Sequence, residues 1–243
     1  MRKALVINGS PSMDRGNTAL ILNPFLGGMK RAGASVDVLY TKKLRINACC
    51  GQFNCWHKTP GKCWQEDGMQ EAYPKLREAD IWVFAAPLYV DGFPGPVKML
   101  LDRILPLVEP FIHIEDGRCR HSLRNGSARQ GKIVLVSNCG FWEIEHFDPL
   151  IAHTRAICKN VHRGFAGALL RPHGPALGGL VKMGAPLFLY EDILKAAEEA
   201  GRQLIAEGKM LPKTTRAVSR ALLPRGLYVA VANRDSKKKL GER

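Results

Sequence analysis

The sequence predicts a single α/β domain in which five parallel strands form a doubly wound sheet between two layers of helices. Five short apolar runs alternate with longer segments whose apolar residues recur at helical spacing. One run, residues 81–87, is apolar at every position, which is typical of a parallel strand covered on both faces. A chain of 243 residues is long enough for one such domain. We expect the strand order 2-1-3-4-5. The expected strands are residues 3–7, 35–40, 81–87, 133–136 and 165–170.

The first strand leads through a polar loop into a helix, in the stretch KALVINGSPSMDRGNT at residues 3–18. A helix N-terminus presents unpaired backbone N–H groups and the positive end of the helix dipole, so this loop predicts an anion site. It lacks the Gly-Lys-Ser/Thr ending of a Walker loop and the three glycines of a dinucleotide site. A cradle for one phosphate remains, and an ordinary capped turn is the alternative. The predicted phosphate-binding residues are Ser10, Ser12, Asn17 and Thr18.

Later loops and helices follow the same alternation. The helix after the first strand contains Pro24 and the pair Gly27-Gly28, so we expect it to kink or end early. The third strand is followed by LYVDGF at residues 88–93 and then by a Pro/Gly segment that opens a helix. Residues 109–130 are irregular and basic, which predicts an insertion rather than a sheet element, serving as a flap or a subunit contact. The fourth strand runs into SNCGFWE at residues 137–143.

Composition and charge limit the classes of function. The chain is 46% hydrophobic and 24% charged, which is ordinary for a globular domain, and no apolar run has membrane-spanning length. The first residues lack the apolar region of a signal peptide, so we expect a cytoplasmic protein with no membrane association. The net charge is +14, but residues 209–243 hold ten Lys and Arg against two acidic residues, a net +8. Since the rest shows no nucleic-acid motif, we do not expect nucleic-acid binding as the main role.

Four of the seven cysteines, Cys49, Cys50, Cys55 and Cys63, lie between residues 46 and 69. In a cytosolic protein such clustering suggests a metal or iron–sulfur site before it suggests disulfides. Cluster ligation typically needs four thiolates separated by two-residue gaps, whereas here Cys49 and Cys50 are neighbours and Gln52 stands three positions after Cys49. Thiols without a metal, an iron–sulfur cluster and a zinc site all stay open.

The loops after strands 1, 3 and 4 lie side by side at the carboxyl edge of a sheet with this strand order. They are also the three unusual loops of this sequence: a phosphate cradle beside two loops that offer aromatic side chains and free backbone amides. That combination fits a phosphorylated planar heterocycle, and flavin mononucleotide (FMN) is the natural candidate.

Four stretches of the chain carry a resemblance to known proteins: NGSP with GNT eight residues on, APLYVDGFPGPVKMLLDR, VSNCGFWE and RPHG. Together they resemble the flavodoxin-fold NADPH-dependent FMN reductases and multimeric flavodoxins, over roughly residues 1–233. The resemblance implies a flavodoxin-like domain at residues 1–211, with insertions at about 44–66 and 109–131 and a basic C-terminal extension at 212–243. It also implies that the four phosphate-binding residues hold FMN and that the other two loops line its ring. The implied ring contacts are Pro87, Leu88, Tyr89, Val90, Asp91, Gly92, Ser137, Asn138, Cys139, Gly140, Trp142 and Glu143.

The cysteine segment resembles the iron–sulfur flavoproteins, in which Cys49, Cys55 and Cys63 match the first, third and fourth ligands and Gln52 replaces the second. The resemblance implies ping-pong hydride transfer from NAD(P)H through FMN to a quinone, flavin, nitro compound or metal oxyanion, with no protein acid or base. Tyr89, Trp142 and Glu143 are the residues expected on the second-substrate side, with a structural role favoured for Trp142. A homodimer or homotetramer is also implied. The alternatives are an iron–sulfur flavoprotein or flavodoxin-type electron carrier, and a flavin-binding regulatory protein acting through its basic tail.

Overall fold

The central sheet has the predicted order and direction. The computed structural model describes residues 1–124 and 131–241. Its main sheet has five parallel strands in the order β2-β1-β3-β6-β7, which corresponds to 2-1-3-4-5 when the inserted hairpin is set aside. The fold class is therefore confirmed. The strands are β1 (Lys3–Asn8), β2 (Ser35–Tyr40), β3 (Ile81–Pro87), β6 (Lys132–Asn138) and β7 (Gly164–Arg171).

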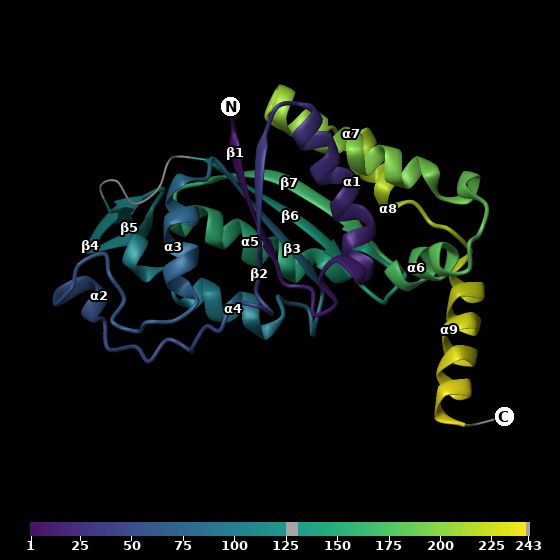
Figure 1. Cartoon of the computed structure of the whole chain (residues 1–243), viewed down its shortest axis with the longest axis horizontal. Coiled ribbons are helices and arrows are strands. Elements are labelled where there is room, and N and C mark those ends of the chain that lie inside the picture. Colours follow the sequence, from purple (N-terminus) through teal and green to yellow (C-terminus); the bar gives the residue numbers. More distant parts are fainter. Residues whose placement is uncertain (125–130, 242–243) are drawn as a thin grey trace.

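Helices cover both faces of the sheet (Figure 1). On one face, α1 (Asn17–Arg31), α6 (Gly174–Lys182), α7 (Glu191–Glu207) and α8 (Pro212–Ser219) share one apolar core with the sheet. On the other face, α3 (Met69–Glu78), α4 (Gly95–Asp102) and α5 (Asp148–Asn160) share a second core. Among the described residues no helix is both long and apolar enough to cross a membrane. The remaining helical segments are η1 (Met13–Arg15), α2 (Asn54–His57), η2 (Leu105–Leu107), η3 (Ile144–Phe147), η4 (Leu187–Leu189) and α9 (Arg225–Leu240).

The predicted early end of the first helix is wrong, because α1 runs unbroken from Asn17 to Arg31 with Pro24 inside it. Its glycines serve close packing instead. A Cβ on Gly28 would overlap the carbonyl oxygen of Glu198 in α7, and a Cβ on Gly201 in α7 would overlap a carbonyl oxygen of α1. The two glycines therefore allow the two helix backbones to touch.

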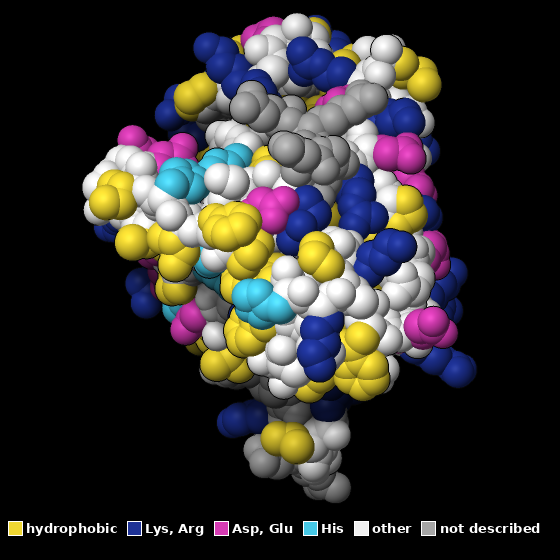
Figure 2. Space-filling view, turned by 90° about the vertical axis from the view of Figure 1, so that its left-hand side faces the viewer, with side chains coloured by type: hydrophobic (Ala, Val, Ile, Leu, Met, Phe, Trp, Pro, Cys, Tyr) yellow, Lys and Arg dark blue, Asp and Glu magenta, His cyan; other side chains and the backbone are white. Residues whose placement is uncertain are grey.

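The insertion after α4 is not irregular, as the sequence suggested, but forms a two-stranded antiparallel hairpin of β4 (Val108–Glu115) and β5 (Arg118–Leu123). The hairpin stands apart from the main sheet beside α2 (Figure 1). Three apolar side chains of β4 are exposed: Phe111, Ile112 and Ile114. Figure 2 shows this end of the molecule, where hydrophobic and His side chains gather. Residues 125–130 of the predicted insertion lie outside the described residues.

Candidate functional site

Three loops meet at the carboxyl edge of the sheet, as predicted. Asn8 at the end of β1 lies opposite Ala85 of β3, and Pro87 of β3 lies opposite Asn138 of β6, so the loops begin side by side. The Leu88 N–H donates to the carbonyl oxygen of Asn138 at 2.8 Å. The Thr18 hydroxyl donates to Asn138 Oδ1 at 2.5 Å, although 120 residues separate the two. These bonds tie the loops into one rim.

The loop after β1 is shaped to receive an anion. The Ser10 N–H donates to Asn8 Oδ1 at 2.9 Å, and Ser10 itself is buried. The chain then curls back, so that a Cβ on Gly16 would lie 2.8 Å from Ser10 Oγ and 3.0 Å from Ser12 Cβ. The loop therefore forms a concave cradle at the start of α1, and any residue larger than glycine at position 16 would fill it.

The N-terminus of α1 has backbone N–H donors without a hydrogen-bond acceptor. Gly16 at its N-cap position has no side chain to accept a hydrogen bond, and within the described residues the N–H groups of Asn17 and Thr18 have no acceptor. Asn8 Nδ2 is also buried without a partner. Because buried donors are rarely left unsatisfied, these free groups indicate a ligand that accepts hydrogen bonds.

The predicted phosphate-binding residues therefore differ in what they offer. Ser10 is buried at the base of the cradle, whereas Ser12 is exposed at its rim. The Asn17 side chain is half-buried and lies against α6, where a Cβ on Gly178 would overlap its Oδ1. The Thr18 hydroxyl is occupied by Asn138, so its backbone N–H is the group left for a phosphate.

The loop after β3 is a tight two-residue turn. Tyr89 and Gly92 exchange backbone hydrogen bonds of 3.1 Å, and Val90 and Asp91 between them have left-handed φ angles of 46° and 58°. A left-handed conformation is strained for a β-branched residue such as Val90, and such strain tends to concentrate at functional sites. Val90 is fully exposed and Tyr89 is half exposed, so both project from the rim, whereas Pro87 beneath them is buried.

The end of β6 and the loop that follows it pass from the buried sheet to the surface. Ser137 is fully buried and its hydroxyl donates to the carbonyl oxygen of Ala86 at 2.8 Å, so this side chain joins the strands. Cys139 is also buried, and burial raises the pKa of its thiol. Of the predicted ring contacts here, Gly140 is exposed, whereas Ser137 and Cys139 are buried.

Trp142 and Glu143 bind the C-terminal part of the chain. Trp142 Nε1 donates to the carbonyl oxygen of Leu223 at 3.2 Å, and the Trp142 ring is stacked on His173 with centroids 6.0 Å apart. Glu143 forms an ion pair with Arg225 at 2.9 Å. Arg171, His173 and Tyr228 also support this loop, and the sequence analysis did not identify them as site residues. Only the RPHG motif, which contains the first two, pointed toward them.

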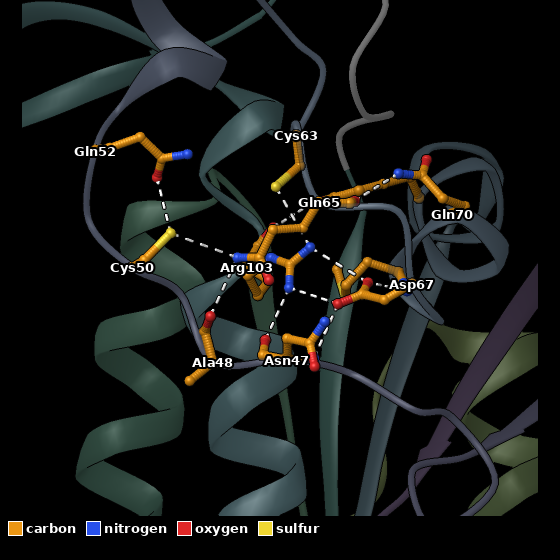
Figure 3. Close-up of polar contacts among 11 residues, drawn as sticks. Asn47, Ala48, Cys50, Gln52, Cys63, Gln65, Asp67, Gln70 and Arg103 are labelled. Atoms are coloured by element: carbon orange, nitrogen blue, oxygen red, sulfur yellow. Dashed lines mark hydrogen bonds and ion pairs between the residues drawn. The ribbon is translucent and has the colours of Figure 1, made fainter.

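The cysteine segment is organised around a buried ion pair (Figure 3). Arg103 and Asp67 approach to 2.8 Å with almost no exposed side-chain surface. The same guanidinium donates to the carbonyl oxygen of Asn47 at 2.7 Å and lies 3.3 Å from Cys63 Sγ. Although burial opposes ionisation, Arg103 keeps the pKa of Asp67 below its usual range. The cysteine segment is thus held to the rest of the chain through the polar contacts of Arg103.

The three predicted metal ligands do not form a metal site as placed. Cys49 is exposed and Cys55 and Cys63 are half-buried, and no group of three His, Cys, Asp or Glu side chains in residues 1–124 and 131–241 is arranged to hold a metal ion. Burial, together with the nearby Cys63 and Cys49, raises the pKa of Cys55. Cys50 donates to Gln52 Oε1 at 3.1 Å. Cys49, Cys55 and Cys63 thus supply three thiols, and Gln52 stands where the sequence comparison places a fourth ligand.

Comparisons with known proteins agree with this geometry. The model of the NADPH-dependent FMN reductase family matches residues 2–150. An iron-sulfur flavoprotein of Archaeoglobus fulgidus is 34% identical over 143 residues, which cover 55% of this chain and 66% of that protein. An iron-sulfur flavoprotein of Methanocaldococcus jannaschii is 33% identical over 105 residues, 43% of this chain and 53% of that protein. The chain thus spans about half to two thirds of the length of these relatives.

Solved structures show the same fold at low identity. An FMN-dependent NADH-azoreductase from Bacillus anthracis in complex with FMN is 16% identical with a TM-score of 0.60, and the match covers 84% of this chain and 100% of that one. An NAD(P)H:quinone oxidoreductase from Methanothermobacter marburgensis is 15% identical with a TM-score of 0.56, over 84% and 98% of the two chains. At these identities the likeness shows the fold alone.

Proposed function

The chain belongs to the NADPH-dependent FMN reductase family, and from that premise we propose that it binds FMN and transfers electrons from NAD(P)H to a small acceptor such as a quinone, a flavin or a nitro compound. The observation that carries the proposal is the cradle at the start of α1. There the chain curls at Gly16, the N–H groups of Asn17 and Thr18 have no acceptor among the described residues, and Asn8 Nδ2 at the end of β1 is buried without a partner. The phosphate of FMN would supply these donors with negatively charged oxygens that accept hydrogen bonds.

Each loop has a separate task in this proposal. The backbone N–H groups of Asn17 and Thr18, with the Ser10 and Ser12 hydroxyls, hold the phosphate. The loops after β3 and β6 position the ring through backbone groups, and the Thr18–Asn138 bond fixes the distance between the phosphate and ring ends of the site. FMN supplies the hydride-transfer chemistry when bound. Tyr89 and Glu143 are proposed to contact the second substrate, since both are partly exposed at the rim.

An anaerobic titration of the purified protein, reconstituted with FMN, tests this function. NADH and NADPH are added separately, and at least one of them should bleach the flavin absorption at one equivalent, after which a quinone should restore it. Bound FMN that neither nucleotide reduces would contradict the reductase function. The two titrations also establish which nicotinamide is the donor.

An iron–sulfur flavoprotein or flavodoxin-type electron carrier is the second candidate, because the curated relatives carry that name and three cysteines match their spacing. Against it stand Gln52 at the second ligand position and the Arg103 contact to Cys63. Anaerobic purification followed by iron and acid-labile sulfide analysis separates the two. Stoichiometric iron and sulfide would favour the electron carrier.

The assembly and location also stay proposals. A homodimer or homotetramer is proposed from the family, and the exposed apolar strand β4 is a surface that such an assembly would cover. The division into a domain at residues 1–211 and an extension at 212–243 is kept, with the qualification that α8 packs into the core through Val218. A cytoplasmic location stays a prediction.

A further inference from the structure

The C-terminal extension grips the loop after β6 at several points. The β6 loop is defined here as residues 139–143, and the clasp as residues 220–228. In the clasp, the Tyr228 hydroxyl donates to the carbonyl oxygen of Gly140, the Leu223 carbonyl accepts from Trp142 Nε1 at 3.2 Å, and Arg225 pairs with Glu143 at 2.9 Å. Two sequence regions some 80 residues apart are therefore joined at the rim of the proposed flavin site.

Two buried side chains at the end of β7 fix the clasp from below. Arg171 donates to the carbonyl oxygens of Val218 at 2.7 Å and Arg220 at 2.8 Å. The Leu222 N–H donates to His173 Nε2 at 3.2 Å. Burial, with the adjacent Arg171, lowers the pKa of His173 to about 4, so its ring is neutral and Nε2 accepts hydrogen bonds both from Arg171 Nη2 at 2.5 Å and from the Leu222 N–H. The clasp is thus anchored to the sheet before it reaches the β6 loop.

Tyr228 controls the orientation of one peptide group. A trans peptide directs its C=O and its N–H to opposite sides, so the bond from Tyr228 to the Gly140 carbonyl turns the Phe141 N–H away from α9. Within the described residues this N–H has no acceptor. The other side of Phe141 is fixed, since its carbonyl oxygen accepts from the His173 N–H at 2.5 Å.

Most of α9 buries little surface against the globular part of the protein. Tyr228 is its buried residue, and Figure 1 shows the helix leaving the globular part beyond its first turns. Burial raises the pKa of Tyr228, so its hydroxyl keeps the proton that it donates. The contact to Gly140 is therefore a specific task of this segment.

We propose that Tyr228 is a positioning residue for FMN: it holds the Gly140–Phe141 peptide so that the Phe141 N–H is presented to the flavin, and the C-terminal extension thereby sets flavin affinity. This inference rests on the proposed function. Nothing in the flavin-binding cradle at α1 depends on it, so the phosphate and ring ends of the site are testable separately.

The test compares Tyr228→Phe with a matched control, Tyr73→Phe. Tyr73 is also buried and its hydroxyl also donates to a backbone carbonyl, that of Arg103 at 2.7 Å, but it belongs to α3. Each variant loses one hydroxyl and keeps its ring. We expect Tyr228→Phe to raise the dissociation constant of FMN roughly three- to tenfold, the effect of one lost hydrogen bond, and Tyr73→Phe to leave it unchanged.

A second measurement uses the protein without FMN. Cys139 and Cys158 are both buried thiols, and only Cys139 belongs to the β6 loop. Their alkylation rates, resolved by mass spectrometry, separate opening of the loop from unfolding. We expect Tyr228→Phe to accelerate alkylation of Cys139 alone. Removal of residues 224–243, which leaves α8 in place, should accelerate it further.

The outcomes are distinct. Unchanged FMN affinity in Tyr228→Phe would overturn the inference whatever happens at Cys139, and so would equal effects of Tyr73→Phe on FMN affinity. Equal acceleration at Cys139 and Cys158 would also overturn it, because the hydroxyl would then serve general stability. If the wild-type protein binds no FMN, the proposed function fails. Selective exposure of Cys139 would in that case still establish the clasp, without its role toward flavin.

Discussion

Gly16→Ala tests the phosphate cradle in isolation. The new Cβ would lie 2.8 Å from Ser10 Oγ and 3.0 Å from Ser12 Cβ, closer than side-chain atoms normally pack. Ser10 is buried and its N–H is held by Asn8, so it has little room to withdraw. The backbone angles of Gly16, φ −89° and ψ 167°, are ordinary for alanine, and no strain is added. The substitution therefore fills the cradle, and the close contacts with Ser10 and Ser12 should lower the free energy of unfolding by about 1–3 kcal/mol without unfolding the protein.

The magnitude follows from the phosphate bonds at stake. Hydrogen bonds to a charged group contribute about 1.5–3 kcal/mol each, so losing one weakens FMN binding by roughly 10- to 100-fold. Riboflavin lacks the phosphate and should bind both proteins equally. Fluorescence titrations of apoprotein with FMN and with riboflavin measure both constants. Gly179→Ala on α6 is the control, because a Cβ there meets no atom within 4 Å.

The reasoning would be refuted by a folded Gly16→Ala protein that binds FMN as tightly as wild type. A parallel loss of FMN and riboflavin affinity would refute it too, since the change would then act on the ring and not on the phosphate.

Three further substitutions test the scaffold. Gly28→Ala places a Cβ on a backbone carbonyl of α7 and should lower the free energy of unfolding in urea by about 1–3 kcal/mol, and an unchanged value would mean that the helices separate freely. Asp67→Asn leaves the Arg103 guanidinium buried without its counter-charge and should cost about 3–5 kcal/mol in the same assay, whereas a loss below about 1 kcal/mol would show that water reaches the pair. The pKa of His173 is lowered to about 4, so the unfolded chain binds the proton first and this residue makes stability rise with pH between about 4 and 6.5, by up to about 1.4 kcal/mol per pH unit. His173→Gln should flatten that part of a stability-against-pH profile, and an identical slope in both proteins would exclude His173 as the cause.

The sheet was predictable because its signals are local. Each strand is a short apolar run, and the fully apolar 81–87 lies at the centre of the sheet as expected. The hairpin was missed although Asp116-Gly117 is a strong hairpin-turn sequence and both residues have left-handed φ angles, because Pro110 and mixed charges break the alternation in β4. Gly27-Gly28 resembles a helix break in sequence, and only the presence of α7 shows that Gly28 serves packing.

The candidate site was predictable in its loops and not in its connections. Polar residues after the first strand and a helix start at Asn17 can be read along the chain. The bond from Thr18 to Asn138 spans 120 residues and that from Tyr228 to Gly140 spans 88, so neither leaves a periodic or local signal. Burial has the same limitation, because the resemblance named Ser137 as a ring contact and only the structure shows that its hydroxyl donates to the Ala86 carbonyl and joins β6 to β3.

The central claim is that one FMN is held by the three loops at the carboxyl edge of the sheet. Isothermal titration of the apoprotein with FMN measures this directly. We expect one FMN bound per chain, with an affinity that exceeds that for riboflavin by at least the contribution of one phosphate hydrogen bond. No heat of binding, or equal affinity for the two flavins, would contradict the account.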